Sequence, residues 1–271
     1  MKIKTRNHFI TFLMILSLGM LILNALFVGH SIYQKSFTFP QNIPTGPFQN
    51  FFITRFNYIS VVTAIFVSLI YIFVSLMFID VEFEKTQSTE ILYIGTFLLG
   101  FLFEFHRLMF PIANLWSDCS RTTAILSRAI TFGRVLSPLS LLFTIIYNNF
   151  ESRQYVEQNI ITLSAVSVFI AVTIPLNTET ILPIGLIKFG LGSLIPNLQI
   201  FVLAVAGFTM LIKSIQNHYH PKLVIGFKLM LLGYALLIDG NSILTCSAGT
   251  ICSFTGTFLY LKNLHRQYLW N

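Results

Sequence analysis

The chain has 271 residues, of which 55% are hydrophobic and only 10% are charged. A soluble domain usually contains about 45–50% apolar and about 25% charged residues. A soluble globular fold is therefore excluded, because too few ionic groups are available to cover the apolar surface. The composition, with a mean hydropathy of +0.75, predicts an all-α, polytopic transmembrane helix bundle that forms a single domain over residues 1–271.

The formal net charge of +7 would raise the question of nucleic-acid binding in a soluble protein. The basic residues are scattered here and form no cluster suited to a phosphate backbone, so we expect no nucleic-acid partner. Their excess is typical of membrane-topology signals and of contact with the headgroups of a lipid bilayer. Three widely spaced cysteines, Cys119, Cys246 and Cys252, exclude a disulfide framework.

Eight apolar stretches are predicted to cross a membrane as helices, because a bilayer core of about 30 Å needs roughly 20 helical residues. They lie near residues 9–29, 56–79, 91–116, 122–147, 158–178, 193–212, 223–238 and 242–261. The first resembles a signal peptide, but its 21-residue apolar run exceeds the roughly 7–15 residues of a signal sequence. We therefore predict a retained helix. The stretch 223–238 contains Lys228 and is the shortest, so seven helices are the alternative.

Lysine and arginine in the connecting segments predict the orientation of the bundle. With the N-terminus inside, nine lie on the inner side and four on the outer side, which places both termini in the cytoplasm. The inner residues are Lys2, Lys4, Arg6, Lys85, Arg153, Lys213, Lys222, Lys262 and Arg266, and the outer ones are Lys35, Arg55, Arg121 and Lys188. An even number of helices agrees with two basic ends on one side.

The connections are short and contain no segment long enough for a separate extramembrane domain. Residues 30–55, with Pro40, Pro44 and Pro47, are expected to extend over the outer face. The segment 178–192 carries Pro183, Gly185, Gly190 and Gly192 among apolar residues, and it fits either an ordinary hydrophobic loop or a short interfacial or re-entrant element.

Ionisable residues inside a membrane cost roughly 2.5–3.5 kcal/mol each and are functional candidates by default. Glu104 lies fifteen residues before Cys119, and Arg134 lies fifteen residues after it, in two antiparallel helices joined by the turn 117–121. This mirrored spacing places both residues at the same depth. It predicts an ion pair between Glu104 and Arg134 across the helical hairpin.

Other charged residues accompany this pair on the same two helices. Arg107 lies three residues after Glu104, which permits a pair within the helix, whereas His106 is expected to point elsewhere. Arg128 shares a helix face with Arg121, and Arg134 is rotated from both. We expect Glu104, Arg107, Arg128 and Arg134 to lie on inward or interhelical faces.

Two interpretations of these residues stay open. They could form a structural ion-pair network that fixes the packing of the hairpin. Alternatively, Glu104, His106, Arg107, Arg128 and Arg134 could line a polar ligand site or a proton path. Three arginines against one glutamate leave a positive excess, which favours an anionic ligand or a lipid phosphate.

The last predicted helix carries small residues at four-residue intervals, Gly249 and Ser253 in one row and Gly256 in the next. Such rows let helix backbones approach closely. We expect tight packing there, either within the bundle or against a second copy of the chain in a homo-oligomer.

Searches for catalytic and metal-binding motifs find nothing that predicts an enzyme or a cofactor. His106 is not part of an HExxH zinc motif, because no second histidine follows at the required spacing. His218 and His220 lack a nearby cysteine or carboxylate, so no metal is predicted. Asp80, Glu82, Glu84 and Glu90 form an acidic inner segment that we expect to be solvated or to contact a protein partner.

Two stretches, residues 130–140 (ITFGRVLSPLS) and 260–270 (YLKNLHRQYLW), resemble parts of uncharacterised multi-spanning membrane proteins of spirochaetes. The resemblance covers most of the chain after residue 50 and implies a bacterial cytoplasmic (inner) membrane, but no activity.

Three functions stay open. The first is a non-enzymatic sensor, receptor-like protein or scaffold subunit, which would act through a partner at the segment 80–90 or the tail 262–271. The second is a small-solute or ion transporter with its site on the hairpin. The third, a lipid-modifying enzyme using Glu104 or His106, lacks a second catalytic group.

Overall fold

The computed structural model describes residues 3–40, 54–84, 86, 88–116, 120–147, 155–217 and 220–269. Its helices and strands are α1 (Ile3–Tyr33), α2 (Tyr58–Phe83), α3 (Glu90–Leu102), the 3₁₀ helix η2 (Phe103–Leu108), α4 (Met109–Ile112), α5 (Arg121–Ile146), α6 (Val156–Thr173), β1 (Leu176–Leu182), β2 (Leu186–Phe189), α7 (Leu194–Asn217), α8 (Pro221–Asp239) and α9 (Ile243–Leu269). Pro44, Pro47, Cys119, His218 and the other residues of the turn 117–119 lie outside the described residues.

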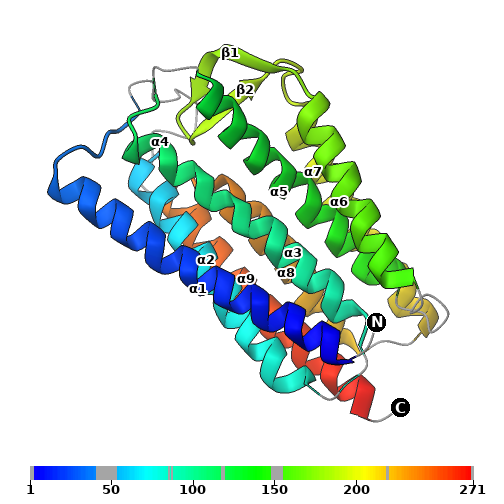
Figure 1. Ribbon diagram of the computed structural model, residues 1–271. Coiled ribbons are helices and arrows are strands. Elements are labelled where there is room, and N and C mark those ends of the chain that lie inside the picture. Colours follow the sequence, from blue (N-terminus) through cyan, green and yellow to red (C-terminus); the bar gives the residue numbers. More distant parts are fainter. Residues whose placement is uncertain are drawn as a thin grey trace.

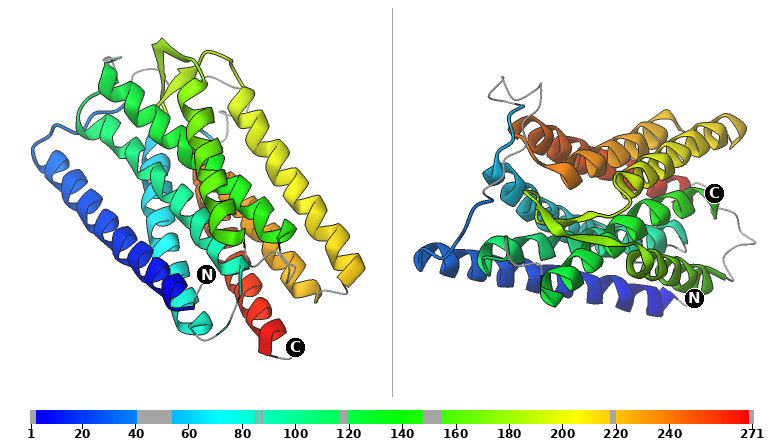
Figure 2. Two further views of the ribbon diagram at one scale, coloured as in Figure 1. Left: turned by 45° about the vertical axis from the view of Figure 1, so that its right-hand side comes forward. Right: turned by 90° about the horizontal axis from the view of Figure 1, so that it is seen from above.

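Eight helical segments are long and apolar enough to cross a membrane when α3, η2 and α4 are counted as one, so the predicted number of helices is confirmed. Both ends of the chain lie at the same end of the bundle, and the two strands lie at the opposite end (Figures 1 and 2). The helix α9 continues to Leu269. Most of the segment 262–271, expected to be a tail, is therefore helical.

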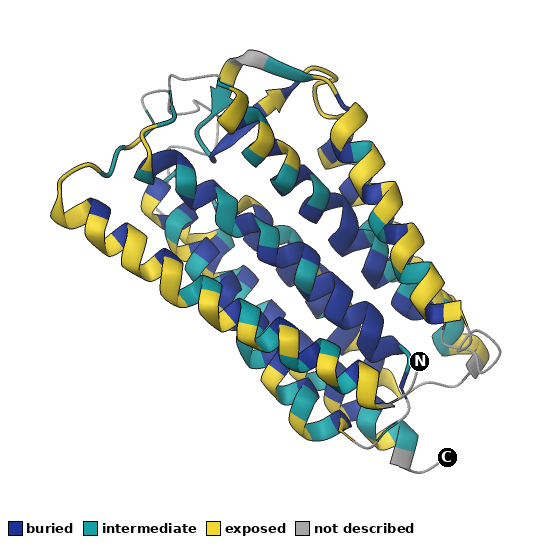
Figure 3. Ribbon diagram, in the orientation of Figure 1, coloured by how far each residue is buried: buried dark blue, intermediate teal, exposed yellow. Residues whose placement is uncertain are grey.

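The helices form an inner and an outer set. In the most apolar window of each helix, 78% of the residues are buried in the α3 segment and 67% in α5, compared with 22% in α1, α6 and α7. Figure 3 shows this contrast between the dark interior and the exposed outer helices. Because other helices enclose α3 and α5, charged side chains on the inner faces of these two helices are buried inside the bundle.

The segment 178–192 is not an ordinary loop, and that expectation is wrong. It belongs to an antiparallel hairpin in which Leu182 pairs with Leu186. The amide of Gly185 donates to the carbonyl of Leu182, with Pro183 as the second residue of the turn and Gly185 at a φ of +75°. A three-residue loop that ends in a left-handed glycine is a common hairpin connection.

The predicted continuous helix 91–116 is interrupted at η2, which contains Glu104, His106 and Arg107. Pro111 gives a physical reason, because a proline has no N–H to donate to the carbonyl four residues earlier and its ring collides with that carbonyl. The affected carbonyl belongs to Arg107. The chain accommodates Pro111 by tightening into a 3₁₀ helix before it.

The small residues of α9 pack against α8 of the same chain. A Cβ atom added to Gly256 would lie 2.5 Å from the backbone nitrogen of Met230, and one added to Gly249 would lie 3.0 Å from the Cβ of Leu236. Ser253 faces Gly233 at the same interface. The predicted tight packing is therefore confirmed within the bundle.

Candidate functional site

The predicted ion pair between Glu104 and Arg134 is present in the interior of the bundle. The Nε atom of Arg134 lies 2.7 Å from Oε1 of Glu104, and its Nη2 atom donates to Oε2 at 3.1 Å. The side chains of Glu104 and Arg134 are only 4% and 6% exposed. This two-point geometry matches the fork of a guanidinium to the two oxygens of a carboxylate, which makes it one of the stronger types of ion pair.

Arg107 completes the cluster from the same segment as Glu104. Its Nη1 atom lies 3.0 Å from Oε2 of Glu104, and its side chain is 1% exposed. Side chains three residues apart lie directly above one another in a 3₁₀ helix, which has three residues per turn. The η2 segment therefore brings Arg107 over Glu104. We call Glu104, Arg107 and Arg134 the charge cluster.

Backbone carbonyl groups from two other elements also bind the charge cluster. The carbonyl of Ile238, next to the last residue of α8, accepts from Nη1 of Arg107 at 2.9 Å and from Nη2 of Arg134 at 3.3 Å. The carbonyl of Ile184, in the turn of the hairpin, accepts from Nε of Arg107 at 2.7 Å. The cluster thus joins η2, α5, the end of α8 and the hairpin.

The end of α8 partly compensates the net positive charge of the cluster. One carboxylate and two guanidinium groups leave a formal charge of +1. The C-terminal end of a helix carries a partial charge of about −0.5, and α8 directs its end at both arginines through Ile238. Asp239, the last residue of α8, interacts electrostatically with Arg134 as well.

Two glycines allow the helices that carry the cluster to approach closely, and we did not predict them from the sequence. A Cβ atom added to Gly133 would collide with the carbonyl oxygen of Gly100 and would lie 2.7 Å from the Cβ of Phe103. One added to Gly100 would lie 2.6 Å from Oγ of Ser137. Gly133 directly precedes Arg134, and Gly100 lies one turn before Glu104. These positions are the signal that could have identified the two glycines.

A proline and a glutamine position the backbone of Arg134. Pro138 in α5 cannot donate to the carbonyl of Arg134, four residues earlier. Nε2 of Gln199, on α7, donates to that carbonyl at 2.8 Å. Gln199 is buried. Its hydrogen bond replaces the one that Pro138 cannot donate within α5, and it links α7 to the charge cluster.

The remaining predicted site residues lie outside the cluster. Arg128 is exposed, so its expected inward position is wrong. It shares the exposed face of Arg121 and is rotated by about 120° from Arg134, at 3.6 residues per turn. His106 points away from the carboxylate, as expected: its ring stacks on Phe105 at 4.0 Å, and its Nδ1 atom lies 2.9 Å from the carbonyl oxygen of Phe103.

Glu90 does not belong to a solvated acidic segment, and that expectation is wrong for this residue. It is 1% exposed, and the hydroxyl of Tyr268 donates to its two oxygens at 2.9 and 2.7 Å. This contact joins the start of α3 to the end of α9. Glu82, in contrast, is 40% exposed and lies 3.7 Å from His265.

The charge cluster offers little free capacity for chemistry. Both oxygens of Glu104 accept from arginines, and carbonyl groups accept from Nε and Nη1 of Arg107 and from Nη2 of Arg134. Nη2 of Arg107 is buried without a hydrogen-bond partner. No group of three or more His, Cys, Asp or Glu side chains within the described part of the chain is arranged to hold a metal ion. Comparisons with protein-family models, curated proteins and solved structures find no match to this chain.

Proposed function

We propose that this protein is a non-enzymatic, multi-pass membrane protein that works as a receptor-like or scaffold subunit with a separate partner. In this proposal the charge cluster is a structural lock that holds η2, α5, α8 and the hairpin together. The observation that carries it is the engagement of Glu104: each oxygen accepts from a guanidinium, and the carbonyl groups of Ile184 and Ile238 accept from the same arginines.

The placement in a membrane rests on the surface of the bundle. Large apolar side chains are exposed along the outer helices, among them Phe12, Leu26, Phe169, Phe201 and Phe208, each at least 61% exposed. We propose that lipid covers them in a bacterial inner membrane, with both termini in the cytoplasm and the hairpin outside. The excess of lysine and arginine in the segments at the end that holds the termini supports this orientation.

Cysteine labelling tests the membrane placement and the orientation together. In a Cys119→Ser background, Lys188→Cys on β2 should react with a membrane-impermeant maleimide added to intact cells. Arg266→Cys on α9 should react only after the cells are opened. The reverse pattern would overturn the orientation, and recovery of the chain in the soluble fraction would overturn the membrane placement.

A transporter is the second candidate, because two observations favour it. A helix interrupted by a 3₁₀ segment often marks a hinge, and transporter sites are often built at such interruptions. The unpartnered Nη2 of Arg107 could also receive an anion. A carboxylate that is fully engaged by arginines nevertheless suits a lock better than a site that must bind and release a solute.

Purified wild-type protein and a Glu104→Gln variant distinguish the lock from the transporter. The lock predicts that Glu104→Gln lowers the amount of monodisperse protein extracted from membranes, and that wild-type proteoliposomes show no flux of chloride, phosphate or protons above empty liposomes. A well-folded Glu104→Gln protein that has lost a flux present in the wild type would support the transporter.

The partner is tested through the exposed basic face of α9. A companion protein that co-purifies at constant stoichiometry should be lost from Arg266→Glu and retained by Lys188→Glu, which makes the same charge change at the other end of the bundle. A wild-type protein that purifies alone from gently solubilised, crosslinked membranes would contradict the scaffold role.

A further inference from the structure

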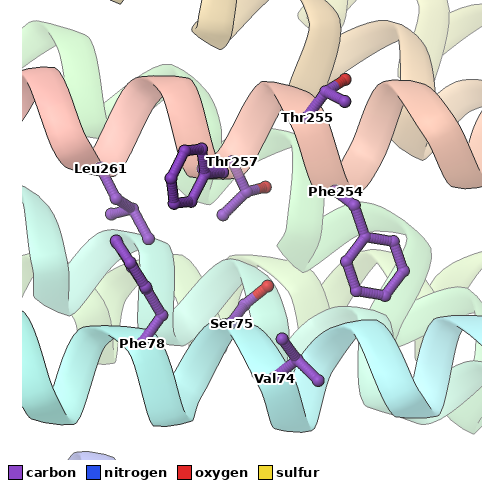
Figure 4. Close-up of a pocket in the computed structure, with 8 residues that line it drawn as sticks. Val74, Ser75, Phe78, Phe254, Thr255, Thr257 and Leu261 are labelled. Carbon is purple, nitrogen blue, oxygen red and sulfur yellow. The ribbon is translucent and has the colours of Figure 1, made fainter.

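A groove of about 300 Å³ lies between α2 and α9, away from the charge cluster. Figure 4 shows Val74, Ser75 and Phe78 of α2 facing Phe254, Thr257 and Leu261 of α9 across it. Ser75, Thr257 and Leu261 are buried and form its floor, whereas Phe258 and Thr255 are exposed at its edge. The volume is at the lower limit of the roughly 300–1,000 Å³ typical of small-molecule sites.

The lining of the groove suits an apolar occupant. Five of its eight side chains are Val, Leu or Phe. The hydroxyl of Thr257 is engaged in the floor, since it lies 2.6 Å from the hydroxyl of Tyr71. The ring of Tyr71 packs edge-on against Phe254 at 5.4 Å, and Phe78 packs against Phe258 at 5.5 Å, so aromatic rings shape the walls.

The groove leads to positive charge at one end. Phe254, Phe258, Lys262 and Arg266 recur every four residues and therefore follow one face of α9. The Nζ atom of Lys262 lies 5.2 Å from the centre of the Phe258 ring, and Lys262 and Arg266 are both exposed. The nearby Glu82 lies 3.7 Å from His265. An occupant with an apolar chain and an anionic head would match this arrangement.

We propose that the groove holds one acyl chain of an anionic phospholipid, with its phosphate at Lys262 and Arg266. This inference rests on the membrane placement proposed above. The eight residues from Phe254 to Lys262 correspond to about 12 Å along the helix, which is close to half of a hydrocarbon core of about 30 Å. A chain in the groove would thus run from the headgroup level toward the middle of the bilayer.

The selectivity of such a site must come from the headgroup. An acyl chain already lies in hydrocarbon, so its transfer into the groove gains no hydrophobic free energy and is favoured only by packing. A basic residue near an anionic headgroup contributes about 1 kcal/mol, which corresponds to about a fivefold change in affinity. Lys262 should therefore favour anionic over neutral lipid by about that factor.

Native mass spectrometry of the full chain tests the headgroup contact. The protein is extracted from nanodiscs that contain equal amounts of phosphatidylglycerol and phosphatidylcholine. The wild type should retain one phosphatidylglycerol, and Lys262→Gln should lower the retained fraction about fivefold. Lys228→Gln removes an equal charge from an exposed position on α8 and should retain lipid as the wild type does. Equal losses in both variants, or no preference for phosphatidylglycerol, would overturn the proposal.

Photocrosslinking tests the position of the chain. A phosphatidylglycerol with a diazirine in its acyl chain should label residues 74–78 and 254–261, and Val74→Trp should abolish that labelling by filling the groove. Val166→Trp, on the exposed face of α6, should leave it intact. Labelling spread evenly over α1, α6 and α7 would refute the groove as a site even for a membrane protein. A chain absent from membranes would instead refute the placement proposed above.

Discussion

Glu104 and Arg134 are joined by two hydrogen bonds between residues that lie thirty positions apart, with Nε to Oε1 at 2.7 Å and Nη2 to Oε2 at 3.1 Å. The pair connects η2 to α5 in the most buried part of the bundle. Removing one partner of a buried pair leaves an uncompensated charge, so the pair constrains the structure strongly even where its net contribution to stability is small. The residues that hold neighbouring elements against this pair each lead to a separate prediction.

Gly133→Ala should destabilise the bundle by about 1–3 kcal/mol, as overpacking of a close contact does. The added methyl group would collide with the carbonyl of Gly100 and press on Phe103. Gly19→Ala, on α1, is the control, because nothing lies within 4 Å of an added Cβ there. Thermal unfolding in detergent should show a lower midpoint for Gly133→Ala alone, and equal midpoints for the two variants would contradict the close approach.

Gln199→Leu should cost about 1–3 kcal/mol, because it leaves the buried carbonyl of Arg134 without a donor. Pro138→Ala restores an N–H four residues after Arg134, so it supplies an alternative donor to the same carbonyl. The double variant Pro138→Ala/Gln199→Leu should therefore lose less stability than the sum of the two single changes. Additive losses in unfolding measurements would show that Gln199 does not replace a helical hydrogen bond.

Gly185→Ala should loosen the hairpin over the charge cluster. The residue has a φ of +75°, and an added Cβ would lie 3.1 Å from the carbonyl oxygen of Arg107. Gly192→Ala shares the backbone strain, with a φ of +61°, but meets nothing within 4 Å. Hydrogen exchange at the amide of Ile187, which donates to Ser127 at 3.0 Å, should accelerate more in Gly185→Ala. Equal exchange in both variants would assign the effect to strain alone.

The sequence was sufficient to predict eight helices and the pairing of Glu104 with Arg134. The apolar stretches define the helices through their length, and equal spacing on each side of a turn places two residues at one depth. The face of α5 on which Arg128 lies could not be predicted in the same way. Because α5 is apolar on several faces, the pattern does not indicate which face contacts the rest of the bundle, and Arg128 is in fact exposed.

The carbonyl groups that accept hydrogen bonds from Arg107 and Arg134 could not be predicted from the sequence, for a different reason. Ile184 and Ile238 contribute carbonyl oxygens, which every residue has, so their side chains carry no sign of this role. The hairpin did have a signal in the spacing of Pro183 and Gly185, which suits a three-residue connection. The shift to a 3₁₀ helix at Glu104 depends on Pro111, whose effect on the carbonyl of Arg107 is local and foreseeable.

A double-mutant cycle on Glu104 and Arg134 tests the structural lock most directly. The free energy of unfolding would be measured in mixed micelles for the wild type, Glu104→Gln, Arg134→Gln and the double variant. We predict a loss of about 3–5 kcal/mol for Glu104→Gln, and a double variant that is more stable than the sum of the single losses by about 0.5–3 kcal/mol. Losses that add to within about 0.3–0.5 kcal/mol would contradict the lock, because they would show that the two residues do not stabilise the bundle through each other.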